Sequence, residues 1–120
     1  MLLTVKANNQ ETTYKYMDNV EFGIEEGNKF TLNVEGLDSK LETPNTEIWF
    51  NKDDSFKIET QPGHDDGNIA FTIYVPYKNS HITVEKEIVS AEFTADEVTV
   101  TMADGTTETF KNEDSFLFEN

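Results

Sequence analysis

The chain has 120 residues, a length typical of one folded domain, and contains 24 acidic but only 9 basic residues. Its net charge of -15 repels nucleic acid and anionic membranes and favours a basic partner. The absence of cysteine excludes disulfides and thiolate metal sites. No apolar run approaches the roughly 18 residues of a membrane span. The first six residues lack the features of a signal peptide, so we expect a cytoplasmic protein.

Alternation of apolar and polar residues predicts strands along most of the chain. The first clear pair covers residues 20–24 and 30–34, joined by a turn at 25–28 with Gly27 in a left-handed conformation. A strand over 13–17 would put Tyr14 and Tyr16 on one face. Residues 37–41 could form one helical turn, and residues 85–88 have enough helix propensity to leave a helix open there as the alternative to a strand. Further strand patterns lie at 48–50, 56–58, 82–84 and 89–93.

Residues 69–75 are apolar or uncharged on both faces, because Ala70, Thr72 and Tyr74 alternate with larger aliphatic and aromatic side chains. This pattern predicts a central strand that is covered on both sides.

The last hairpin allows a prediction of register. A two-residue turn at Asp104-Gly105 would place Phe110 opposite Thr99, on the wrong face. A three-residue loop over 103–105, with Gly105 left-handed, instead pairs Phe110 with Val98. This register also pairs Thr99 with Thr109 on the solvent face. We therefore predict the three-residue loop, followed by a closing strand over 116–118.

Turn-forming residues divide the chain into short segments, and evidence for helices is thin. The pattern predicts an all-β fold, with at most one short helix, in a single domain over 1–120. The architecture is an antiparallel sandwich or a partly open barrel built from hairpins.

Two groups of residues could hold a cation. His64, Asp65 and Asp66 lie between two glycines, and Asp53-Asp54 could combine with Glu47 and Glu59. Both groups have the composition of ordinary polar turns, which explains them more simply. The spacing around His64 fits neither an EF-hand loop nor the His-Glu-x-x-His motif of zinc enzymes. No metal or cofactor is therefore predicted.

Catalytic motifs are absent from the sequence. No serine lies in a nucleophile-elbow pattern, and the six glycines are scattered singly, so there is no phosphate-binding loop. We therefore expect a protein that is not an enzyme. Trp49 and the tyrosines could form a platform for sugars or a partner, although rings of this kind more often complete a core.

The acidic residues are the strongest functional lead. They occur at strand positions expected to face outward: Glu21, Glu35, Glu47, Glu59, Glu92, Glu97 and Glu108. They also occur in turns. A rigid β scaffold that spreads carboxylates over its surface can imitate the phosphates of a nucleic acid and compete for a basic groove. The residues predicted to contact the partner are Glu25, Glu26, Glu47, Asp53, Asp54, Glu59, Asp65 and Asp66.

The function predicted from sequence is therefore an acidic binding protein that docks a basic, nucleic-acid-binding protein. In size and composition the chain is similar to accessory proteins of phages and mobile elements, some of which inhibit nucleases or CRISPR effectors. Two alternatives remain open. One is a structural β module of a phage particle or bacterial assembly, and the other is a cation-dependent carbohydrate or adhesion module. Excess charge could also serve solubility alone.

Overall fold

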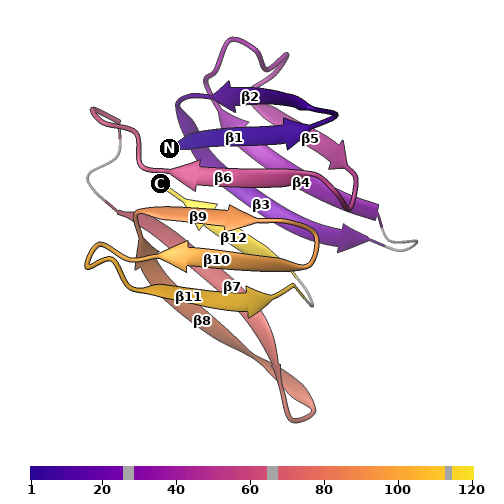
Figure 1. Ribbon diagram of the computed structural model, residues 1–120, viewed down its shortest axis with the longest axis vertical. Coiled ribbons are helices and arrows are strands. Elements are labelled where there is room, and N and C mark those ends of the chain that lie inside the picture. The colour runs from indigo at the N-terminus through magenta and orange to yellow at the C-terminus, as the bar shows by residue number, and fades with distance from the viewer. Residues whose placement is uncertain (26–28, 65–67, 113–114) are drawn as a thin grey trace.

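A computed structural model of the chain shows two six-stranded antiparallel sheets packed as a sandwich (Figure 1). It describes residues 1–25, 29–64, 68–112 and 115–120; the side chains at 25, 29, 76 and 77 lie outside that description. Sheet A has the strand order β11-β10-β9-β6-β1-β2, and sheet B has the order β5-β4-β3-β12-β7-β8. None of the described residues is helical, and these residues contain no helix that could span a membrane.

The strands of sheet A are β1 (Leu2–Ala7), β2 (Gln10–Tyr14), β6 (Ser55–Glu59), β9 (Ser90–Phe93), β10 (Glu97–Thr101) and β11 (Thr107–Lys111). Those of sheet B are β3 (Met17–Glu25), β4 (Lys29–Gly36), β5 (Asn45–Phe50), β7 (Ile69–Tyr77), β8 (Ser80–Ile88) and β12 (Phe116–Glu119). Both sheets keep two open edges, so the alternatives left by the sequence resolve to a sandwich and not a barrel.

The two sheets are held together by phenylalanine. Ring contacts join all nine phenylalanines of the chain into one network between the sheets. Phe22 and Phe116 stack at the centre, with ring centroids 4.5 Å apart. Phe93 of sheet A meets both rings edge-on. Each fully buried ring contributes about 2–3 kcal/mol of hydrophobic stabilisation, so the network offsets the low apolar content of 36%.

Two predicted hairpins form as expected. β10 and β11 pair Val98 with Phe110 and Thr99 with Thr109, whose hydroxyl oxygens lie 2.8 Å apart. Gly105 has a φ of 87°, which confirms the left-handed position in a three-residue loop. β3 and β4 pair antiparallel as predicted, with the apolar residues of one strand opposite those of the other, and the pairing continues to Glu25 and Lys29. The predicted conformation of Gly27 falls on residues 26–28, which lie outside the described part.

Four sequence expectations are corrected. β2 ends at Tyr14 and the chain turns at Tyr16, whose φ is 58°, so residues 13–17 are not one strand. Residues 37–41 contain a turn instead of a helix, because the side chain of Asp38 binds nearby backbone. One face of β7 is open to solvent, since Tyr74 on that face is 44% exposed. Glu108 lies on the inward side of the edge strand β11, where its carboxylate is 3.1 Å from the Lys86 amine of β8.

Substitution Gly105→Ala should lower the free energy of unfolding by about 1–2 kcal/mol, because a Cβ is disfavoured at positive φ. Urea denaturation of the purified variant measures this loss. Ala103→Ser in the same loop is the control and should change stability by less than about 0.5 kcal/mol. A Gly105→Ala protein as stable as the parent would contradict the loop assignment.

Candidate functional site

The outer face of sheet B carries a regular array of carboxylates. We call the outward glutamates of this sheet the acidic face: Glu21 (β3), Glu35 (β4), Glu47 (β5), Glu85 and Glu87 (β8), and Glu119 (β12). All six side chains are exposed. They share one side of the sheet because successive side chains on a strand alternate between its two faces.

The strand registers place these glutamates in two rows across the sheet. One row runs from β5 to β8 as Asn45, Glu35, Asn19, Glu119, Ala70 and Glu87. The next runs as Glu47, Asn33, Glu21, Leu117, Thr72 and Glu85. Within each row one or two neutral residues separate the carboxylates. From β5 to β12, a strand that carries a glutamate in one row carries a neutral residue in the other.

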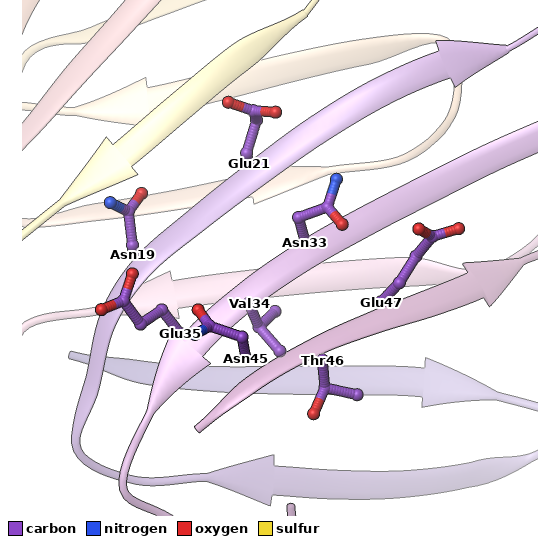
Figure 2. Close-up of a pocket in the computed structure, with 8 residues that line it drawn as sticks. All are labelled: Asn19, Glu21, Asn33, Val34, Glu35, Asn45, Thr46 and Glu47. Carbon is purple, nitrogen blue, oxygen red and sulfur yellow. The ribbon is translucent and has the colours of Figure 1, made fainter. Parts of the chain in front are cut away.

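This arrangement limits the repulsion between like charges. Glu21 and Glu47 stand on the same side of the sheet with Asn33 between them, as Figure 2 shows. Two strands of separation put such residues about 10 Å apart, where the repulsion in water is about 0.4 kcal/mol per pair. Diagonal neighbours such as Glu35 and Glu47 lie about 7–8 Å apart. The sheet can therefore display many negative charges at a tolerable cost.

The densest part of the acidic face is slightly hollowed. A depression of about 320 Å³ is lined by residues from three neighbouring strands: Asn19, Glu21, Asn33, Val34, Glu35, Asn45, Thr46 and Glu47 (Figure 2). Amides and carboxylates dominate this lining. The depression therefore presents hydrogen-bond acceptors and negative charge to anything that lies across the sheet.

The outer face of sheet A has a different electrostatic character. Glu11 is opposite Lys6, Glu97 is opposite Lys111, and Glu92 is opposite Lys57. Lys57 also lies 3.7 Å from the carboxylate of Glu59. Each glutamate on this face thus has a neighbouring lysine. On the outer face of sheet B, the positions with described side chains include no lysine at all. Among the side chains that the structure describes, negative charge is therefore concentrated on the outer face of sheet B.

Two large aromatic side chains stand on the same face as the acidic array. Trp49 on β5 is 53% exposed, and Tyr74 on β7 is 44% exposed. Trp49 is opposite Thr31, which is in turn opposite Gly23. Glu47 is two residues from Trp49 on the same strand, so a ring and a carboxylate stand side by side. Such a pair suits a cationic side chain, which can lie over the ring and bind the carboxylate.

Among the residues predicted from sequence to contact a partner, those whose side chains the structure describes do not gather at one place. Glu47 belongs to the acidic face of sheet B, whereas Glu59 faces outward from sheet A. Asp53 is exposed in the connection between β5 and β6. Glu25 ends β3, with its side chain outside the described part. Glu47 and Glu59 thus lie on opposite sides of the sandwich, which rules out the cation site suggested for them.

Asp54 has a structural role. Its side chain is only 7% exposed and accepts a hydrogen bond from the backbone N–H of Asn51 at 2.9 Å. In return, the Asp54 N–H donates to the Asn51 carbonyl. The carboxylate therefore closes the turn before β6. Glu26, Asp65 and Asp66 lie outside the described residues.

His64 joins three separate segments. Its Nε2 is 3.3 Å from a carboxylate oxygen of Asp18 and 3.2 Å from the side-chain amide of Asn120. The Tyr16 ring packs edge-on against it at 5.6 Å. These contacts connect the loop that contains His64 with residues 16–18, at the start of β3, and with Asn120, which follows β12. Among the residues that the structure describes, no group of three or more His, Asp or Glu side chains is arranged to hold a metal ion.

Asp38 is a further acid with a structural role. Its carboxylate accepts hydrogen bonds of 2.7 Å from the backbone N–H groups of Lys15 and Lys40, and the Lys40 ammonium lies 3.4 Å away. Burial raises the pKa of Asp38, but these hydrogen bonds and the lysine charge outweigh burial and hold the pKa below its ordinary 3.8. Asp38 thereby ties the turn after β2 to the segment after β4.

Asp38→Asn should lower the free energy of unfolding by about 1–3 kcal/mol at pH 7, because one backbone donor loses its acceptor. A pKa that is depressed in the folded state stabilises the fold above the unfolded value and loses that effect as pH falls. The difference between parent and variant should therefore be constant above about pH 5 and shrink below 3.8. Urea titrations across pH measure this difference. The exposed substitution Asp53→Asn is the control, and a gap that persists undiminished at low pH would contradict the assignment.

Comparisons with protein-family models, curated proteins and solved structures gave no match. The sequence identified outward acids on several strands, but the pairing of strands was needed to assign them to one sheet or the other. Glu85, Glu87 and Glu119 were missed because each adjoins a charged or chain-end segment that lacks a clear alternating pattern.

Proposed function

We propose that this protein is a non-enzymatic binding protein that docks the acidic face of sheet B onto a basic protein surface in the cytoplasm. The observation that carries the proposal is the carboxylate array, which lacks lysine at every position with a described side chain. A protein that needed charge only for solubility would not require it to be segregated. On sheet A, by contrast, lysines accompany the glutamates.

In its sharpest form, the proposal is an inhibitor that mimics nucleic acid, such as one that a phage or mobile element directs against a nuclease or a CRISPR effector. Basic grooves bind nucleic acid largely through the charges of its phosphates. A rigid sheet with regularly spaced carboxylates offers the same groove a competing polyanion. Steering by complementary charge would make association fast and sensitive to salt.

The location of the charge can be tested separately from its amount. The triple variant Glu21→Gln, Glu35→Gln, Glu47→Gln removes three carboxylates from sheet B. Its matched control, Glu59→Gln, Glu92→Gln, Glu97→Gln, removes three from sheet A. Both variants change the net charge from -15 to -12, because each loses three negative charges.

We expect affinity capture from a low-GC bacterial lysate to retain a basic, nucleic-acid-binding protein with the parent and with the sheet A variant. The sheet B variant should bind that protein about tenfold more weakly, and 300 mM salt should reduce all binding. Duplex DNA should compete with the parent for the captured protein. Equal weakening of the two variants would show non-specific attraction and would count against the acidic face.

Trp49 provides a second, spectroscopic test, because it is the only tryptophan of the chain. Binding across the acidic face should shift its fluorescence emission, and Trp49→Ala should weaken binding by about 10- to 100-fold, as expected for an aromatic anchor. Trp49→Phe should retain part of the affinity. An unchanged emission spectrum at saturation would place the partner elsewhere. An emission shift with neutral oligosaccharides, indifferent to salt, would instead support the carbohydrate-binding alternative.

A further inference from the structure

The longest open edge of the molecule is β8. It has nine residues, compared with six in β5 and five in each of β2 and β11, which form the other three edges. An edge strand presents a row of backbone donors and acceptors that can pair with another strand. The β7–β8 hairpin also extends past its neighbour, because β12 pairs with β7 only from Ala70 to Ile73 (Figure 1).

The chemistry of this hairpin differs from the rest of the chain. Residues 67–84 are the longest stretch without Asp or Glu. Ile82, on the inner side of β8, is 44% exposed, and Val84 beside it is only partly buried. The distal half of β8 is thus an uncharged, apolar edge in an otherwise acidic protein. The usual protection of an edge by a lysine is weakened here, because Lys86 is paired with Glu108 of sheet A.

One hydrogen bond shows which N–H and C=O groups of β8 point to the open edge. The Tyr74 N–H donates to the Ser115 carbonyl, away from β8. Tyr74 is opposite Thr83, so this pair lacks hydrogen bonds within the hairpin. The N–H and C=O of Thr83 therefore point to the open edge, and those of Glu85 and Glu87 follow by alternation.

We propose that β8 pairs with β8 of a second copy of this chain, antiparallel about a two-fold axis at Thr83. This register sets Ile82 opposite Val84 of the second copy, Thr83 opposite Thr83, and His81 opposite Glu85. Apolar side chains thus lie opposite apolar ones, the two Thr83 hydroxyls lie opposite each other, and the imidazole of His81 lies opposite the carboxylate of Glu85. A two-fold contact of this type is the commonest way in which a chain self-associates.

Other registers about nearby residues are less favourable. An axis at Glu85 or at Lys86 sets identical charges against each other. An axis at Ile82 sets Lys78 opposite Lys86, and an axis at Val84 sets Ile82 opposite Lys86. A register that pairs odd-numbered with even-numbered residues is also unfavourable. It would place backbone N–H and C=O groups that point to the open edge opposite residues whose backbone groups point toward β7. Among these registers, the axis at Thr83 therefore gives the most favourable pairs.

This dimer would join the two copies of sheet B into one continuous sheet, with both acidic faces on the same side. It does not depend on the proposed function. Each copy carries a net charge of -15, so mutual repulsion opposes the dimer. Salt screens this repulsion, since the screening length falls from about 10 Å at 0.1 M to about 3 Å at 1 M. Self-association should therefore strengthen with salt, whereas docking to a basic partner should weaken.

Sedimentation velocity of the full chain tests the proposal. We expect a monomer–dimer equilibrium whose dissociation constant falls about tenfold between 0.1 and 1 M NaCl. Thr83→Pro removes the N–H group at the centre of the proposed contact but breaks no hydrogen bond within the β7–β8 hairpin. This variant should therefore abolish the dimer. Thr83→Val keeps that N–H and is the matched control; circular dichroism confirms that both variants fold.

Because the chain has no cysteine, Thr83→Cys gives a second readout. Hydrogen-bonded residues opposite each other have Cα atoms about 5.5 Å apart, which suits a disulfide. Mild oxidation should therefore join two copies of this variant, and Thr107→Cys on β11 should remain monomeric. A monomer at every salt concentration, or a dimer that tolerates Thr83→Pro, would overturn the proposal. Neither result would affect binding of a basic partner to the acidic face.

Discussion

The structure depends on the packing of phenylalanine rings between the two sheets. The apolar content of the chain is only 36%, and nine of its residues are phenylalanine. Phe22 and Phe116 stack at the centre of sheet B, and Phe93 reaches them from sheet A. The rings fill the space between the sheets together with buried aliphatic residues such as Leu32 and Ile73. The remaining strand positions are left for polar and charged residues.

This division allows the two outer faces to differ. Neither face is needed for the core, so sheet A can balance its glutamates with lysines while sheet B spaces its glutamates with asparagine. Asn33 between Glu21 and Glu47 shows the principle: it keeps two carboxylates on one surface without direct contact. Carboxylates that serve the fold, such as those of Asp38 and Asp54, are instead nearly buried and bind backbone N–H groups. Burial and hydrogen bonding therefore separate structural from displayed acids.

Local features of the fold could be predicted from the sequence, and global ones could not. The register of the last hairpin followed from the spacing of Val98, Gly105 and Phe110, because turn geometry fixes pairing between adjacent strands. No local sequence pattern indicates that β12 lies between β3 and β7, because these two partners are distant from β12 in the chain. Tyr74 was expected to be covered because its strand is apolar, but a small neighbour such as Ala70 fits an open face equally well. The acidic face shares this limitation: alternation identified outward acids, but sheet membership depends on long-range pairing.

The central place of β12 has a consequence for how the chain reaches this structure. Phe116 pairs with Phe22, so the two halves of sheet B cannot join until segments far apart in sequence have met. Folding dominated by such distant pairings is slow, on the order of milliseconds to seconds. During that time apolar strands are exposed and could associate between molecules. A chain with a net charge of -15 repels its copies during this interval, so the same carboxylates that mark one face would also protect the protein from aggregation before that face exists.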